Sequence, residues 1–278
     1  MRIDAHHHLW RYDPAAFGWI EPGSAIARDF LAEDLAAARR SARIDACIAV
    51  QARQIPGETA FLLDCAANVP WIAGVVGWID LRAPDIGAAI EADAHPKIVG
   101  YRHVVQDEAD PRFLLQEAFV RGVGAVVAHG LTYDLLVDHE QLTDVPALLE
   151  RVGGGRFVLD HAAKPAIATD GWQPWADRIA AVAACSDVWC KVSGLVTEAD
   201  HDAWTDDQVY RYLDHVMSAF GPERLIWGSD WPVCLLAAPY GEVVRLVEDF
   251  VATRCPDARD AIFGGNAARA YALEDSIR

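Results

Sequence analysis

Short apolar runs alternate with longer stretches of helical character along the whole chain. The runs are rich in β-branched residues and predict eight strands, at residues 2–10, 46–52, 71–81, 97–105, 131–137, 156–165, 188–195 and 224–233. The stretches between them carry apolar residues at helical spacing and predict helices, at residues 29–43, 111–127, 145–152, 175–185, 206–220 and 241–253. Asp29 is the expected N-cap of the first of these helices, and Pro111 is expected in the first turn of the second.

Strands that alternate with helices predict parallel βα units. With 278 residues and eight such units, the expected fold is α/β, a single (β/α)8 TIM barrel over residues 1–278. The alternative is an open doubly wound sheet, but the Gly-rich phosphate turn typical of that fold is absent after the first run. A barrel would place the catalytic residues at the carboxyl ends of its strands.

Polar and charged residues collect at these predicted strand ends. Three histidines end the first run in an apolar setting that is not typical of a purification tag. The fourth and fifth runs end in Arg-His and Tyr-Asp, the sixth in Asp-His with a lysine close behind, and the eighth in Asp-Trp. In chain order the residues of interest are His6, His7, His8, Arg102, His103, Tyr133, Asp134, Asp160, His161, Lys164, Asp230 and Trp231.

The side-chain period of two in a strand sorts the opening histidines. His6 and His8 are expected to face the barrel axis together with Asp4, and Asp4 is expected to orient His6. His7 is expected to face the helices and to have a structural role. His129, just before Gly130, is expected to end a helix and to be structural as well.

Four of these residues form a set that suits a divalent ion, typically zinc. They are His6, His8, His161 and Asp230. The same four residues also suit an acid/base cluster without a metal, in which Asp230 activates water. The sequence leaves both possibilities open.

Composition excludes several classes of partner. The formal net charge is −17, from 41 acidic against 24 basic residues, which argues against nucleic acid and anionic membranes as partners. No apolar run approaches the length of roughly 18 residues needed to span a bilayer. No secretory signal is recognisable, and the six cysteines form no C-x-x-C pair. A cytoplasmic protein with a small-molecule substrate is expected, as a monomer or a homo-oligomer.

Three segments, DAHHH, VLDHAAKP and WGSDWPV, resemble the amidohydrolase superfamily and, within it, the sugar-lactonase-like branch. The resemblance extends over nearly the whole chain. It implies a (β/α)8 barrel that hydrolyses lactones, with His6, His8, His161 and Asp230 in the site. Binuclear members carry a Lys or Glu at the end of strand 4, where this chain has Arg102 and His103. One divalent metal or none is therefore expected.

Hydrolysis of a cyclic ester needs an attacking water, a polarised carbonyl and a proton for the leaving oxygen. Asp230 is expected to act as general base and acid. A zinc ion on His6 and His8 would polarise the carbonyl, or without metal the imidazoles and Arg102 would do so. The residues expected to bind substrate are Arg102, His103, Tyr133, Lys164, Trp10 and Trp231.

Two further functions remain open from the sequence. One is a metal-dependent decarboxylase of an aromatic or enoic acid on the same scaffold. The other is a binding protein that retains a histidine pocket without catalysis.

Overall fold

The computed structural model describes residues 1–185 and 187–273 and contains one eight-stranded parallel sheet. Its strands pair in chain order, β1 with β2 through to β7 with β8. Each of the eight predicted strands is confirmed, although all are shorter than the apolar run that predicted them. They are β1 (Ile3–His7), β2 (Ala46–Val50), β3 (Ile72–Gly77), β4 (Ile98–Val104), β5 (Thr132–Leu136), β6 (Arg156–Leu159), β7 (Val188–Val192) and β8 (Leu225–Trp227).

The sheet closes between β1 and the segment that follows β8. The backbone N–H of His8 donates to the carbonyl of Trp231 at 2.6 Å, and that of Asp230 donates to the carbonyl of His6 at 2.8 Å. The predicted (β/α)8 TIM barrel is therefore confirmed, and the open doubly wound sheet is wrong. The same closure brings the end of the chain's first strand beside Asp230.

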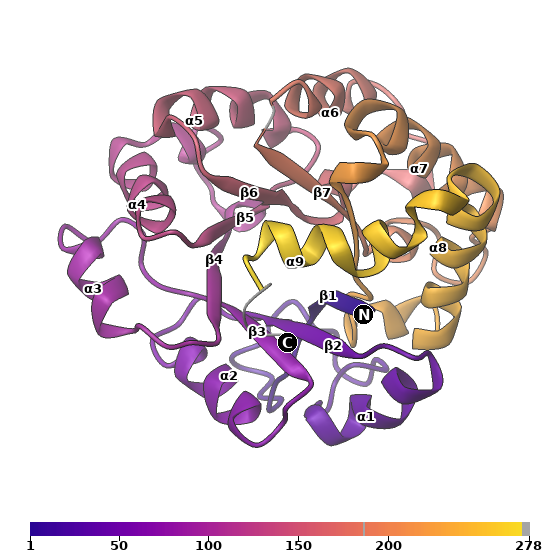
Figure 1. The fold of residues 1–278 in the computed structure, drawn as a ribbon, viewed down its shortest axis with the longest axis horizontal. Helices are drawn as coiled ribbons and strands as arrows, with labels where there is room; N and C mark the ends of the chain where they lie inside the picture. Colours follow the sequence, from indigo (N-terminus) through magenta and orange to yellow (C-terminus); the bar gives the residue numbers. More distant parts are fainter. Residues whose placement is uncertain (186, 274–278) are drawn as a thin grey trace.

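Helices surround the strands, and a last short helix crosses one end of the barrel (Figure 1). The predicted helices at 145–152 and 206–220 match the structure residue for residue, and the others differ at their ends. The helices are α1 (Ala32–Ser41), α2 (Glu58–Ala67), α3 (Ile86–Ala92), α4 (Glu117–Ala128), α5 (Val145–Val152), α6 (Trp175–Ala183), α7 (Asp206–Phe220), α8 (Tyr240–Arg254) and α9 (Asn266–Ala270).

Two predicted helix starts are wrong. Leu31, not Asp29, is the N-cap of α1, because the Asp34 carboxylate accepts the backbone N–H of Leu31 at 2.9 Å. Asp29 instead accepts the N–H of Tyr12 at 2.8 Å. Pro111 precedes α4, which begins only at Glu117.

The amino-terminal half of the barrel interior is an apolar core. Side chains from the strands meet the C-terminal segment there, and Ala267, Ala270 and Tyr271 close that end of the barrel. The apolar members from the strands are Ile3, Ala5, Ala46, Ile48, Val50, Val76, Val99, Val158 and Ile226. Packing of this kind stabilises the barrel and leaves the carboxyl ends of the strands for chemistry.

Among the described residues, no helix combines the length and apolar character needed to cross a bilayer.

Candidate active site

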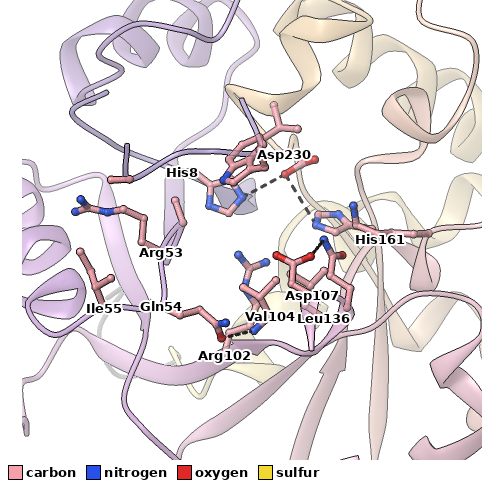
Figure 2. Close-up of a pocket in the computed structure, with 16 residues that line it drawn as sticks. His8, Arg53, Gln54, Ile55, Arg102, Val104, Asp107, Leu136, His161 and Asp230 are labelled. Carbon is pink, nitrogen blue, oxygen red and sulfur yellow. Dashed lines mark hydrogen bonds and ion pairs between the residues drawn. The ribbon is translucent and has the colours of Figure 1, made fainter. Parts of the chain in front are cut away.

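A pocket of about 370 Å³ opens at the carboxyl ends of the strands (Figure 2). Its wall combines histidines and carboxylates with arginine, lysine and apolar side chains from several βα loops. The lining residues are His8, Ala16, Trp19, Ala52, Arg53, Gln54, Ile55, Arg102, Val104, Gln106, Asp107, Leu136, His161, Lys164, Asp230 and Val233.

A bulge in β1 decides which of its side chains face the barrel interior. The pairing register with β2 shifts between Asp4 and His7. Ala5 packs in the interior core and the His6 ring contacts interior residues, so two successive side chains face inward. A bulge adds one residue to one strand and interrupts the alternation in this way.

The bulge overturns the expected role of Asp4. This carboxylate faces outward, where it accepts the hydroxyl of Ser229 at 2.6 Å and that of Tyr240 in α8 at 3.1 Å. Its contact with His6 is to the backbone N–H, at 3.2 Å, and not to the ring. Asp4 therefore ties β1 to the loop after β8 and does not orient the imidazole.

Three imidazoles converge on one oxygen of Asp230. The Oδ1 atom lies 3.4 Å from His8 Nε2, 3.7 Å from His6 Nε2 and 3.9 Å from His161 Nε2. Figure 2 shows His8 and His161 turned toward Asp230 on one side of the pocket. His6 is fully buried beneath them. The four residues predicted as the central set thus lie together.

Hydrogen bonds at the far ring nitrogens orient two of these histidines. His8 Nδ1 lies 2.9 Å from the carbonyl oxygen of Val50, which can only accept, so Nδ1 carries the proton. His161 Nδ1 lies 2.9 Å from the hydroxyl of Ser193. Both Nε2 atoms therefore point at Asp230. Such orientation of the ring through its second nitrogen is typical of metal-binding histidines.

A left-handed turn presents His161 to the pocket. β6 ends at Leu159, and the four residues His161–Lys164 all have positive φ, between 48° and 55°. None is a glycine, and a left-handed backbone costs such residues roughly 1–2 kcal/mol each. The indole N–H of Trp175 in α6 stabilises the turn by donating to the carbonyl of Ala162 at 2.8 Å. Strain of this size concentrates at functional sites.

Gly194 makes the close approach of His161 and Asp230 possible. A Cβ atom at this position would lie 2.7 Å from His161 Nδ1 and 3.1 Å from Asp230 Oδ2. Its φ of +66° also favours glycine. The residue follows β7 and leaves space that any larger side chain would fill.

A network of buried charges lies directly under the pocket. Lys191 Nζ donates to Asp134 at 2.6 Å, and it lies 2.9 Å from Asp160 and 3.1 Å from His6 Nδ1. Arg102 donates to Asp160 at 2.9 Å and to the Gln51 carbonyl at 2.6 Å. The hydroxyl of Tyr271, from the C-terminal segment, donates to Asp134 at 2.7 Å.

Sequence reasoning singled out Arg102, Asp134 and Asp160 at their strand ends but missed Lys191 and Tyr271. Lys191 is the one charged residue in the run VWCKV of β7. A lone charge at an inward position of an apolar strand was the available signal. No sequence signal connects Tyr271 to Asp134, because 137 positions separate them.

Burial and the neighbouring charges set the protonation states of the site. Burial lowers the pKa of His161 to about 4 and that of His6 well below its ordinary value, so both rings are neutral at pH 7. Burial opposes the ionisation of Asp230, but the neighbouring histidines outweigh it and hold its pKa below the ordinary value. Burial raises the pKa of Asp134 to about 6, against the effect of Lys191.

The central residues fit one divalent cation. His6, His161 and Asp230 offer ligand atoms that all lie within 4.8 Å of one another, and His8 Nε2 is 3.2 Å from His6 Nε2. Ligand atoms around a tetrahedral ion with bonds of about 2.1 Å are separated by roughly 3.4 Å. Neutral imidazoles and an ionised carboxylate are also the protonation states that bind metals.

The family model for amidohydrolases matches residues 3–273. The chain belongs to the amidohydrolase family. The expected family is therefore confirmed, and with it the expectation of an enzyme.

This amidohydrolase is similar to two curated relatives over nearly its whole length. An L-fucono-1,5-lactonase from Burkholderia multivorans is 45% identical, over 99% of this chain and 97% of the relative. An L-fucono-1,5-lactonase from Burkholderia ambifaria is 37% identical, over 99% of this chain and 96% of the relative. A crystal structure of an amidohydrolase from Burkholderia multivorans with bound zinc superimposes with a TM-score of 0.95, at 45% identity, over 98% and 99% of the two chains.

Two residues expected to bind substrate face away from the pocket of this amidohydrolase. His103 stacks on Phe113 with ring centroids 4.9 Å apart and contacts Glu108 at 2.7 Å. Tyr133 is fully buried against Phe119 of α4. Both side chains point outward toward the helices, since Arg102 and Asp134 occupy the inward positions beside them. Neither side chain lines the pocket.

The two tryptophans expected to stack on a sugar also lie outside the pocket lining. Trp10 is fully buried and donates its indole N–H to the Arg28 carbonyl at 2.9 Å. Trp231 packs edge-on against Phe30, with centroids 5.1 Å apart. Both belong to an aromatic cluster under the β1–α1 loop. The aromatic residue that lines the pocket is Trp19, which sequence reasoning missed.

Two of the residues expected to bind substrate, Arg102 and Lys164, line the pocket, and Lys164 also pairs with Glu198 at 3.1 Å. His7 is buried on the outer face of β1 beside Trp71, with centroids 6.2 Å apart. His129 ends α4, and its Nδ1 contacts the Ala125 carbonyl at 2.7 Å.

Proposed function

We propose that this amidohydrolase is a lactonase that opens the ring of a sugar-acid lactone by attack of water. The observation that carries the proposal is the ionised carboxylate of Asp230, held by three imidazoles at the inner wall of a pocket of about 370 Å³. The two L-fucono-1,5-lactonases, at 45% and 37% identity over 99% of this chain, support a sugar-acid lactone as the substrate class.

Asp230 acts as general base and then as general acid. Its carboxylate takes a proton from water as the water oxygen bonds to the lactone carbonyl carbon. The ring C–O bond then breaks, and Asp230 returns the proton to the leaving oxygen to give a hydroxy acid. The guanidinium of Arg102 lines the pocket and stabilises the negative charge that develops on the carbonyl oxygen.

We propose zinc as the cofactor, held by His6, His8, His161 and Asp230. Support comes from the spacing of their ligand atoms and from the zinc-bound amidohydrolase of Burkholderia multivorans. When bound, the ion lowers the pKa of water and polarises the lactone carbonyl. The buried network beneath the site has a separate role, because Lys191 and Asp160 fix the position of the His6 ring from its other nitrogen.

The test is acid release from a panel of aldonolactones and aromatic-derived lactones, assayed with and without a chelator and with zinc added back. Release of acid without carbon dioxide is expected. If the protein instead releases carbon dioxide from an aromatic or enoic acid and opens no lactone, the lactonase proposal is wrong and the protein is a decarboxylase.

Asp230→Asn supplies the decisive variant. We expect kcat to fall about 10²–10⁴-fold, since the variant cannot accept the proton. Asp170→Asn, at an exposed carboxylate that pairs with Arg211, is the matched control and should keep parental turnover. Full activity of Asp230→Asn on every lactone the parent accepts would sink the mechanism.

A further inference from the structure

The carboxylate of Asp4 is fully buried on the outer face of β1 and accepts hydrogen bonds from four donors. Its Oδ1 atom accepts the backbone N–H of Ser229 at 2.8 Å and that of His6 at 3.2 Å. Its Oδ2 atom accepts the hydroxyl of Ser229 at 2.6 Å and that of Tyr240 at 3.1 Å. A carboxylate can accept about four hydrogen bonds, so these donors use its capacity in full. Such a complete set offsets the cost of burying the group.

The Ser229 hydroxyl connects Asp4 to the backbone of Asp230. Its oxygen accepts the backbone N–H of Trp231 at 3.0 Å, while its own proton is donated to Asp4. The backbone N–H of Asp230 donates to the carbonyl of His6 at 2.8 Å. The peptide groups on both sides of the Asp230 Cα atom are therefore fixed, one by the Ser229 hydroxyl and the other by β1.

The backbone of Asp230 needs this support. Its φ is +57°, in the left-handed region that residues other than glycine adopt rarely. A backbone of this kind persists where the surrounding structure holds it. Gly228 lets the loop lie against β1, since a Cβ atom there would lie 2.7 Å from the Cβ atom of His6. The backbone conformation of Asp230 in turn determines where its carboxylate lies relative to His8 and His161.

Tyr240 and Ser229 contact the same oxygen of Asp4 but differ in what else they hold. Tyr240 is the first residue of α8, and its hydroxyl joins Asp4 to the layer of helices. Ser229 precedes Asp230 in the chain, and its hydroxyl also fixes the peptide group that follows Asp230. Removal of either hydroxyl takes one hydrogen bond from Asp4. Removal of the Ser229 hydroxyl also frees the backbone of Asp230.

We propose that Asp4 is a positioning residue for the reaction, which holds the carboxylate of Asp230 in place for the attacking water through the hydroxyl of Ser229. The inference rests on the proposed lactonase function and adds a residue that touches neither the substrate nor the reacting atoms. β1 thus carries His6 toward the site on its inner face and supports Asp230 from its outer face.

The main experiment compares Ser229→Ala with Tyr240→Phe by kcat, by KM and by urea unfolding, on the lactone that the parent opens fastest. Both variants should lower the free energy of unfolding by similar amounts. Only Ser229→Ala should lower kcat, by about tenfold and with KM almost unchanged, because a displaced carboxylate impairs the chemical step and not binding. Equal losses of kcat in the two variants, or parental kcat in Ser229→Ala, would overturn the inference.

Two substitutions of Asp4 test the carboxylate itself. Asp4→Ala removes every acceptor and should lower kcat about 10²-fold. Asp4→Asn keeps one oxygen for the two backbone N–H groups, and its amide can donate to the two hydroxyls, which also accept. It should therefore restore most of the parental kcat, and a loss as large as that of Asp4→Ala would contradict positioning through hydrogen bonds. If Asp4→Ala does not fold, Asp4→Asn and Ser229→Ala still decide the question.

NMR spectra of the histidine rings provide a measurement that needs no substrate. A displaced Asp230 should shift the ring signals of His8 and His161 in Ser229→Ala, whereas Tyr240→Phe should keep the parental signals. Unchanged signals in Ser229→Ala would refute the role of Asp4 whatever the reaction is. If the parent opens no lactone while Ser229→Ala shows the shifts, the proposed function is refuted and Asp4 remains the support of Asp230.

Discussion

His7 and Tyr133, on the outer face of the barrel strands, are as fully buried as the polar residues of the inner face but differ from them in their partners. On the inner face, His6, Lys191 and Asp134 belong to one continuous set of contacts beneath the pocket. On the outer face, neither ring nitrogen of His7 nor the hydroxyl of Tyr133 has a hydrogen-bond partner within residues 1–185 and 187–273. Burial and polarity therefore do not identify the site. The site is identified by contacts that converge on one pocket.

The largest expected effect comes from removing the cation of the inner face. Lys191→Met leaves Asp134 and Asp160 buried without their shared partner, and we expect a loss of about 3–5 kcal/mol in the free energy of unfolding. Urea unfolding followed by tryptophan fluorescence measures it. The control is Arg112→Met, which removes the pair between the exposed Arg112 and Asp144 and should cost less than about 1 kcal/mol. Equal losses in the two variants would contradict the importance of the inner network.

The second effect tests how closely the catalytic groups must approach each other. Gly194→Ala places a methyl group 2.7 Å from His161 Nδ1, and we expect kcat to fall about 10²-fold because the imidazole must move. Gly241→Ala is the control, since its Cβ meets no atom within 4 Å. If Gly194→Ala keeps the kcat of the control, the site tolerates displacement of His161.

The third expected effect is on the pH dependence of the free energy of unfolding, and it comes from His7 on the outer face of β1. Burial lowers the pKa of His7 to about 3, whereas an unfolded histidine takes up its proton near pH 6.5. Between pH 6.5 and 3 the unfolded state therefore binds more protons, and stability is lost as the pH falls.

We expect His7→Leu to remove about 2 kcal/mol of the stability loss between pH 7 and pH 5, at about 1.4 kcal/mol per pH unit below 6.5. Urea unfolding at pH 7, 6 and 5 measures the change. The exposed His201 offers the control, and His201→Leu should keep the parental pH dependence. An unchanged pH dependence in His7→Leu would show that this ring protonates in the folded protein.

The smallest effect compares two buried tyrosine hydroxyls directly. Tyr271→Phe removes a hydrogen bond to Asp134 and should cost about 1.5 kcal/mol, as expected for a bond to a charged group. Tyr133→Phe removes a hydroxyl without a partner and should be neutral or slightly stabilising. Thermal unfolding of the two variants separates them. The reverse order would mean that the inner and outer faces do not differ as their contacts indicate.

Several features of the protein could be predicted from the sequence because they depend on local pattern. The apolar runs predicted all eight strands, and the parallel order follows from their alternation with helices. His6, His8, His161 and Asp230 could be grouped because the carboxyl ends of parallel strands meet at one end of a barrel. The start of the first helix could not be predicted from Asp29, and that of α4 could not be predicted from Pro111. In α1 the Asp34 carboxylate accepts the backbone N–H of Leu31, so that Leu31 is the N-cap.

The amino-acid sequence by itself determined the fold, the family and the composition of the central site, since periodicity and short motifs carry that information. Only the tertiary structure decided which neighbouring residues face the pocket. The bulge in β1 turned Asp4 outward, the strand alternation turned His103 and Tyr133 toward the helices, and a left-handed turn without glycine presented His161. Lys191 and Tyr271 acquired their partners from segments far away in the chain. Such contacts depend on how the strands close around one axis, and no local pattern encodes that closure.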